Sequence, residues 1–232
     1  MNINLDYICN IPSEYKRFKE IDNLIDKGYL TITTLEDYYL HSTNIKYIIS
    51  FARYYYKDIN ISKLEDIIVL SKKEEYIYSF AKNVNGANIL RLEEEILKLN
   101  NIEYIYKFLK NINVSNKNKF IEKIANSNNP RYIYKTAKNI KEVDIIYFTN
   151  QIINTNNPIY IYKFARDIKE ANIKLLEEGI IKTEDYYMIY RFALNIKEAN
   201  KEKLLKIYNN YLKNIFVVKK FPTQETLSIF VV

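Results

Sequence analysis

Apolar and polar residues alternate along this chain in short helical patterns. In the stretch that starts at Tyr160, apolar residues stand at Ile161, Phe164, Ala165 and Ile168, the i, i+3, i+4, i+7 spacing of an amphipathic helix. A polar loop follows, and a second apolar pattern begins just after Asn172, a good N-cap residue. Such a unit predicts two short helices, which we call helix A and helix B.

The unit recurs at a constant interval. If the first residue of each tyrosine-rich block is position 1, blocks start at residues 76, 104, 132, 160 and 188, which are 28 apart, and an earlier copy starts at Tyr47. Self-similarity at this period is typical of solenoids, in which each unit buries its apolar face against its neighbours. In the five blocks that are 28 residues apart, position 13 offers an N-cap for helix B: Asn88, Asn116, Asp144, Asn172 and Asn200.

These patterns predict an all-α fold, a right-handed α-solenoid of about six two-helix repeats over residues 47–211. Residues 1–46 form an N-terminal helical cap, with one helix from Ser13 to about Asp26 that Gly28 stops and another around residues 35–40. Residues 212–232 are expected to be irregular or to form a short β hairpin, or to dock over the last repeat, because β-branched runs at 215–218 and 227–232 flank Pro222.

Composition supports a folded helical protein. The chain is 48% hydrophobic and 27% charged, too apolar for disorder, and its three glycines and four prolines are few for an all-β fold. The net charge of +7 permits contact with nucleic acid or an acidic protein, although Asn, Ile, Lys and Tyr are also the residues that AT-rich coding favours. With a lone cysteine, no basic leader and no long apolar run, the sequence predicts a cytoplasmic protein without a membrane partner.

No pattern along the chain indicates a catalytic, cofactor or metal site, so we do not expect an enzyme. The acidic groups at Glu65-Asp66, Glu93-Glu94-Glu95 and Glu177-Glu178 are interpreted as a solvated face, because adjacent residues diverge around a helix. His41 stands at the end of a predicted helix, where it is expected to cap carbonyl groups rather than bind a metal.

Helix A carries a recurrent set of tyrosine and basic residues. If position 2 points inward, positions 4 and 7 point outward and position 3 flanks them. These positions make a ladder that either is a solvated face with tyrosines filling the seams between repeats, or binds phosphates or an acidic protein. Its residues hardly vary, so any nucleic-acid binding would be insensitive to base sequence. The ladder comprises Tyr78, Lys82, Tyr106, Lys107, Lys110, Tyr134, Lys135, Lys138, Tyr162, Lys163, Arg166, Tyr190 and Arg191.

The unit Tyr-Ile-Tyr-Lys-Phe-Ala followed by Ala-Asn-Ile, over residues 160–173, resembles short helical repeats of AT-rich bacterial and phage proteins and, more distantly, HEAT-type solenoids. The resemblance covers roughly residues 47–211. It implies a non-enzymatic scaffold that binds a protein or ribonucleoprotein through one face. One special case is a phage or mobile-element inhibitor of a host nucleoprotein or nuclease, of the anti-CRISPR kind. The alternatives are sequence-independent nucleic-acid binding through the ladder and, remotely, a HEAT-like DNA glycosylase.

Overall fold

The computed structural model describes residues 3–219, and side chains as far as residue 215; within these residues every regular element is a helix. The chain divides into two compact units, residues 1–120 and 121–232. The first unit holds α1 (Leu5–Cys9), α2 (Glu14–Asp26), α3 (Ile32–Leu40), α4 (Ile45–Tyr54), α5 (Ile61–Leu70), α6 (Glu74–Asn83), α7 (Ile89–Leu99) and α8 (Ile102–Asn111). Helix α9 (Lys117–Ala125) runs from the first unit into the second, which continues with α10 (Pro130–Asn139), α11 (Ile145–Asn154), α12 (Pro158–Asp167), α13 (Ile173–Lys182), α14 (Tyr186–Asn195) and α15 (Lys201–Lys219).

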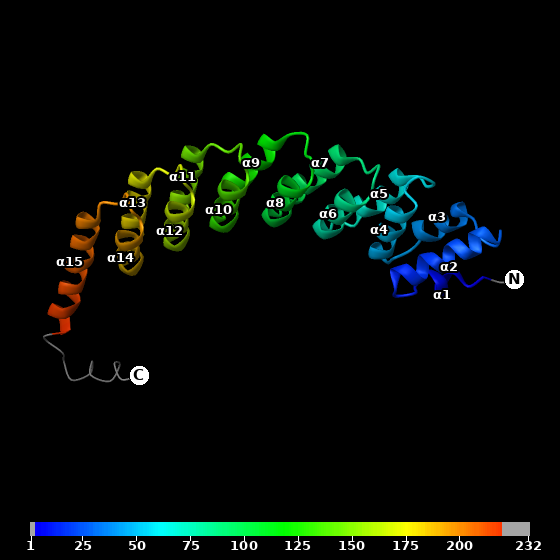
Figure 1. Ribbon diagram of the computed structural model, residues 1–232, viewed down its shortest axis with the longest axis horizontal. Coiled ribbons are helices and arrows are strands. Elements are labelled where there is room, and N and C mark those ends of the chain that lie inside the picture. Colours follow the sequence, from blue (N-terminus) through cyan, green and yellow to red (C-terminus); the bar gives the residue numbers. More distant parts are fainter. Residues whose placement is uncertain (1–2, 220–232) are drawn as a thin grey trace. The chain divides into compact units, whose positions relative to one another are not determined.

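The helices of each unit form two rows. In the second unit, α10, α12 and α14 pack side by side as one row, and α11 and α13 pack in the other, with each even-numbered helix also packed on the odd-numbered helix that follows it (Figure 1). In the first unit, α4, α6 and α8 form the corresponding row. From α4 onward, even-numbered helices are helix A and odd-numbered helices are helix B. The all-α arrangement of consecutively packed helix pairs is confirmed.

Helix starts follow the predicted caps. The side chain of Asn157 accepts a hydrogen bond from the backbone N–H of Tyr160 at 3.2 Å, and Pro158 occupies the first turn of α12. Asn172 caps α13 in the same way through the N–H of Leu175, at 3.1 Å. Equivalent caps occur at other helices of the array, for example α7 and α11, whereas among the described residues no side-chain hydrogen bond caps the starts of α5 and α6.

The turn from helix B to the next helix A is also repeated. After α13, the Thr183 hydroxyl donates to the carbonyl of Ile180 at 2.7 Å and accepts from the N–H of Asp185 at 3.4 Å. The residue between them has left-handed backbone, which ends the helix. Such positive φ values, between 50° and 60°, occur at Lys72, Asn100, Asn128, Asn156 and Glu184.

A column of phenylalanines at position 5 forms the core between the two rows, with one exception. Phe164 in α12 and Phe192 in α14 have no exposed surface, and the same holds for Phe80 and Phe108 in the first unit. In α10 this position is Thr136, which is equally buried, and its hydroxyl has no hydrogen-bond partner among the described residues. Leaving a buried hydroxyl unpaired destabilises a fold by roughly 1–3 kcal/mol, so α10 has the weakest version of this core position.

Helices α2 and α3 lie where helices were predicted, whereas the short helix α1 was not predicted. Ser13 caps α2, and Gly28 follows this helix with a φ of 70°. The His41 ring nitrogen Nδ1 donates to the carbonyl of Asp37 at 2.8 Å, so His41 caps the end of α3 as expected.

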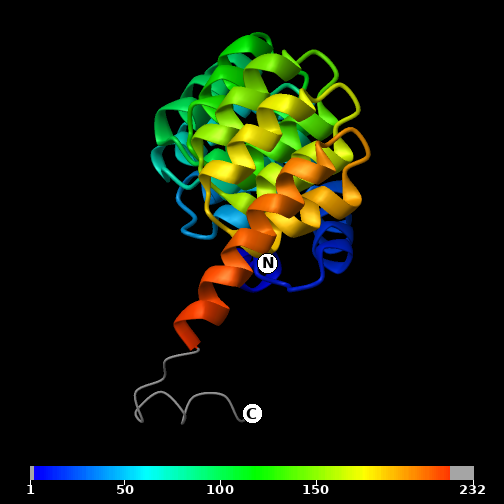
Figure 2. The same ribbon diagram turned by 90° about the vertical axis from the view of Figure 1, so that its left-hand side faces the viewer.

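The C-terminal end differs from the expectation. Helix α15 continues past Tyr211 through residues 215–218 to Lys219, where irregular or β structure was predicted. The reason is that no glycine or proline interrupts the chain between Lys201 and Lys219, so the β-branched residues continue a helix that is already nucleated. Figure 2 shows this longer helix projecting past α14. The predicted hairpin or docked tail otherwise falls on residues 220–232, which lie outside the described residues.

Candidate binding face

The predicted ladder lies on the helix A rows with its members at different depths. The basic residues of position 7, such as Lys138 and Arg166, are exposed, whereas those of position 4, such as Lys135 and Lys163, are half-buried. The tyrosines of position 3 are half-buried or buried, and Tyr162 keeps only 4% of its surface exposed. The tyrosines therefore form the floor of the face and the basic groups its outer layer.

In the second unit, cations lie over tyrosine rings. The Lys135 ammonium is 5.2 Å from the centre of the Tyr132 ring, and the Lys163 ammonium is 4.9 Å from that of Tyr160. The Arg191 guanidinium lies 5.0 Å from the ring of Tyr162, one repeat earlier. Each contact of this kind contributes about 0.5–1 kcal/mol at an exposed site, which favours positions of the basic side chains above the rings.

Rings also meet between repeats. The centres of Tyr134 in α10 and Tyr160 in α12 are 6.0 Å apart, and Tyr190 in α14 stacks on Tyr208 in α15 at 4.7 Å. Because packed aromatic pairs gain energy beyond the area they bury, the tyrosines also hold neighbouring repeats together. The same tyrosines therefore pack between neighbouring repeats and form part of the surface of the helix A row.

Asp167 joins two repeats of this face. Its carboxylate accepts a hydrogen bond from the Tyr134 hydroxyl, one from the Lys138 ammonium at 3.2 Å and two from Arg166, at 2.7 and 3.1 Å. These donors, the Arg166 guanidinium foremost, hold the pKa of Asp167 well below its usual range. Burial and the Asp167 carboxylate raise the pKa of the Tyr134 hydroxyl.

The first unit has a comparable but less charged arrangement. Asn111 occupies the position equivalent to Asp167, and its side-chain amide donates to the Tyr78 hydroxyl at 2.9 Å. The Lys107 ammonium lies 4.1 Å from the centre of the Tyr104 ring and 2.7 Å from the carboxylate of Glu103. Part of the positive charge of the ladder is therefore balanced within the protein.

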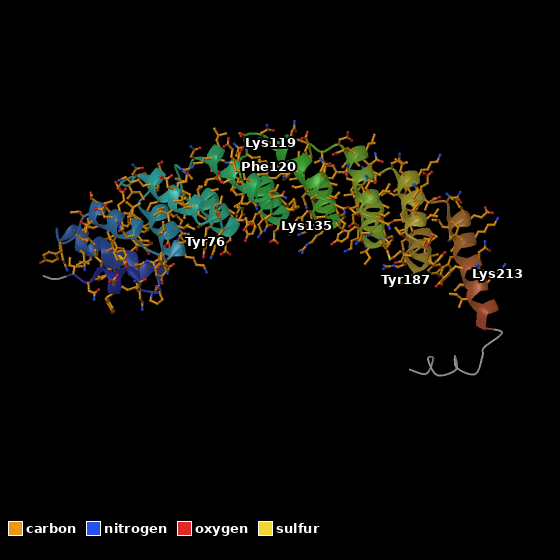
Figure 3. The ribbon with its side chains drawn as sticks, turned by 180° about the vertical axis from the view of Figure 1, so that it is seen from behind. Tyr76, Lys119, Phe120, Lys135, Tyr187 and Lys213 are labelled. Atoms are coloured by element: carbon orange, nitrogen blue, oxygen red, sulfur yellow. The ribbon has the colours of Figure 1, made fainter. Side chains whose placement is uncertain are left out.

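Figure 3 labels residues in both units. Lys135 and Tyr187 lie along the edge formed by the even-numbered helices of the second unit. Tyr76 lies on the corresponding edge of the first unit, whereas Lys119 lies on its odd-numbered side.

The acidic residues of helix B require a correction. Glu65, Glu93 and Glu177 were interpreted as part of a solvated face, but they are 1%, 4% and 6% exposed. Each carboxylate instead reaches the start of the next helix B. Glu65 accepts from the N–H of Asn88 at 2.8 Å, Glu93 from the N–H and hydroxyl of Ser115 at 2.7 and 2.6 Å, and Glu177 from the N–H of Asn200 at 2.7 Å and from Lys203 at 3.0 Å.

These carboxylate links satisfy unpaired donors and place negative charge at a helix N-terminus, which is favourable on both counts. Burial raises the pKa of Glu65. Links of this kind are not made at every repeat, because the equivalent positions hold Ile121 and Thr149. The recurrence of Glu at residues 65, 93 and 177, 28 residues or a multiple of 28 apart, was the signal in the sequence that could have identified them.

Among the described residues, no three His, Cys, Asp or Glu side chains converge in a way that could hold a metal ion. Over the same part of the chain, no helix combines the length and apolar character needed to cross a membrane. Comparisons with protein-family models, curated proteins and solved structures find no match for this chain.

Proposed function

We propose that this protein is a non-enzymatic scaffold that binds an acidic protein surface through the tyrosine and basic side chains of its helix A rows. The observation that carries the proposal is the pairing in the second unit, where Lys135, Lys163 and Arg191 lie 4.9–5.2 Å from tyrosine ring centres. Side chains held in one arrangement lose less entropy when they bind. Tyrosine and arginine are also enriched at protein interfaces.

The internal charge balance favours a protein over nucleic acid as the partner. Asp167 pairs with both Lys138 and Arg166, and Lys107 pairs with Glu103. Cations that are already paired contribute less to the release of counterions that dominates nucleic-acid affinity. An acidic protein, which also offers hydrogen bonds and apolar contacts, can use the tyrosines as well as the charges.

A narrower form of the proposal makes the partner a host nucleoprotein or nuclease that the protein inhibits. Its support is the resemblance of the repeat unit over residues 160–173 to repeats of bacterial and phage proteins. In this form the helix A face would occupy a surface that the host protein needs for its own activity.

The first experiment is a pull-down with the tagged protein from a native or host-like lysate, divided into nuclease-treated and untreated halves. The scaffold proposal predicts a protein partner that survives nuclease and is lost with the variant Lys135→Glu/Lys163→Glu. The matched control replaces exposed lysines of helix B, as Lys119→Glu/Lys174→Glu, which changes the net charge by the same amount. Equal loss with both variants would show that overall charge, not the helix A face, governs binding.

Sequence-independent nucleic-acid binding is the second candidate, and the repeated basic residues over aromatic rings favour it. It predicts that the partners vanish with nuclease and that the affinity for single-stranded nucleic acid falls steeply as salt rises. Replacing Lys107, Lys135 and Lys163 by Glu would then abolish binding. Unchanged binding by that variant would reject this candidate.

A further inference from the structure

A cavity of about 430 Å³ lies in the first unit, away from the helix A ladder. It is lined by side chains of α2 together with Tyr54 at the end of α4. Its chemistry differs from that of the ladder, since its lining combines aromatic rings with carboxylates. The lining consists of Tyr15, Phe18, Lys19, Asp22, Asn23, Asp26 and Tyr54.

The aromatic wall of this cavity is built and held in place. The Tyr54 ring stacks on the buried Phe18 ring, with centres 4.3 Å apart and planes 10° from parallel. The Tyr54 hydroxyl donates to Asp22 at 2.7 Å, and the Tyr55 hydroxyl donates to the other oxygen of the same carboxylate at 2.6 Å. Two tyrosine hydroxyls therefore orient Asp22, while Tyr54 remains 49% exposed.

A further aromatic residue of the lining, Tyr15 in α2, is exposed to solvent. Tyr15 is 74% exposed, although a tyrosine ring normally gains by burial. The Lys19 ammonium lies 6.0 Å from its ring centre, so one face of the ring already attracts a cation from the chain itself. Asp26, at the end of α2, is exposed at the rim.

The charge of the cavity is opposite in sign to that of the protein. Asp22 and Asp26 outnumber Lys19, so the lining has a net charge of −1, whereas the whole chain has +7. Rings with carboxylates beside them favour a cation, because the ring face and the carboxylates attract the same charge. A guanidinium suits the site best, since it is planar, stacks on rings and forms hydrogen bonds to carboxylates.

We propose that the cavity between α2 and Tyr54 binds an arginine side chain of a partner protein. The guanidinium lies against Tyr54 with Asp22 and Asp26 as its counter-charges, and the rest of the arginine residue extends along α2 toward Tyr15. Lys19 then competes with the incoming cation. This proposal does not depend on the helix A face, because no residue of the ladder lines the cavity.

The test is an NMR titration of the full chain with N-acetyl-arginine methylamide. The matched probe is N-acetyl-citrulline methylamide, which has the same shape without the charge. We expect saturable shifts of the Tyr15 and Tyr54 ring signals with the arginine probe and an affinity at least about fivefold lower for the citrulline probe, as expected when a cation–π contact and a charge pair are lost. N-acetyl-lysine methylamide, as a further arm, should bind more weakly than the arginine probe.

Variants with opposite expected effects sharpen the test. Asp26→Asn removes an attracting charge and should weaken arginine binding several-fold, whereas Lys19→Gln removes the competing cation and should strengthen it. Tyr15→Ala should weaken binding, and Tyr7→Ala, which changes an equally exposed tyrosine that does not line the cavity, should not. All four positions are exposed, so the fold should survive these changes, which circular dichroism verifies.

The proposal is overturned if the citrulline probe binds as well as the arginine probe, if Asp26→Asn and Lys19→Gln change the affinity in the same direction, or if no saturable shift occurs at Tyr15 and Tyr54. Equal shifts at Tyr7 and Tyr15 would also overturn it, because they would show general adhesion of the probe to exposed tyrosines.

Discussion

The carboxylate of Glu177 in α13 accepts a hydrogen bond from the backbone N–H of Asn200 at the start of α15, at 2.7 Å. This contact joins two consecutive B helices through a charged acceptor that is almost fully buried. Since helices of about ten residues are marginal alone, links between repeats supply stability that the separate helices lack.

Glu177→Ala should lower the free energy of unfolding by about 1.5–3 kcal/mol, the usual cost of losing a hydrogen bond to a charged group. The matched control is Glu178→Ala, because the adjacent Glu178 is exposed and its loss should change stability by less than about 0.5 kcal/mol. Urea unfolding followed by circular dichroism measures both. Similar effects of the two variants would contradict the assigned role of Glu177.

The buried threonines Thr136 and Thr149 of the second unit allow a second matched comparison of variants. Within the part of the chain that the structure describes, the Thr136 hydroxyl is unpaired, whereas the Thr149 hydroxyl donates to the carbonyl of Ile145 at 2.8 Å. Thr136→Val should raise the free energy of unfolding by about 1 kcal/mol, because it removes an unpaired buried polar group while keeping the shape. Thr149→Val should instead be neutral or lose up to about 1 kcal/mol. Thermal unfolding measures the stability of both variants. A destabilised Thr136→Val would show that the Thr136 hydroxyl has a hydrogen-bond partner in solution.

Asp167 predicts a pH-dependent difference in stability. A carboxylate whose pKa is depressed in the folded state stabilises the fold above its unfolded pKa of about 3.9 and loses this contribution as the pH falls through the folded value. Because the pKa of Asp167 is held well below its usual range, the stability difference between the natural protein and Asp167→Asn should be constant from about pH 5 to 7 and shrink below about pH 4.

Urea titrations at a series of pH values measure this difference for Asp167. Asp144→Asn serves as the control, since either residue type caps a helix well. A stability difference that grew as the pH fell would have the wrong sign for a depressed pKa.

The repeat itself predicts which deletions the chain tolerates. Deleting residues 145–172 joins the cap Asp144 directly to Ile173, a junction equivalent to Asp144–Ile145, and keeps the link from Glu177 to Asn200. That variant should unfold cooperatively, at a lower temperature because one interface between repeats is lost. Deleting residues 158–172 removes α12 alone and should abolish cooperative unfolding, because α13 then lacks its partner in the other row. Calorimetry distinguishes the two outcomes.

Much of the fold could be predicted because its determinants are local. Asn88 and Asp144 mark helix starts by their own side chains, and the apolar spacing defines each buried stripe without reference to other repeats. His41 could be assigned as a cap for the same reason. The end of α15 could not be predicted in this way, because the strand preference of residues 215–218 was outweighed by the helix that precedes them.

The contacts of the candidate site were harder to predict because they form between repeats. Glu177 is hydrophilic, and only the N-terminus of the following helix B makes its burial favourable. Tyr162 could be assigned to a flank of helix A, but its degree of burial depends on the neighbouring repeat. The cavity beside Tyr54 depends on two helices that are far apart in sequence, and the residues that line it do not recur with the repeat.

The carboxylate links have a direction, since a side chain of one repeat always reaches the backbone of the next. The ribosome delivers repeats in the same order, so each glutamate of the series emerges before the N–H groups that will bind it. A growing array that ends in such a repeat therefore keeps its carboxylate in water until the next helix B supplies the N–H donor, because burying the charge without a partner is costly. In α15 the equivalent position is Leu205, so this helix carries no glutamate of the series.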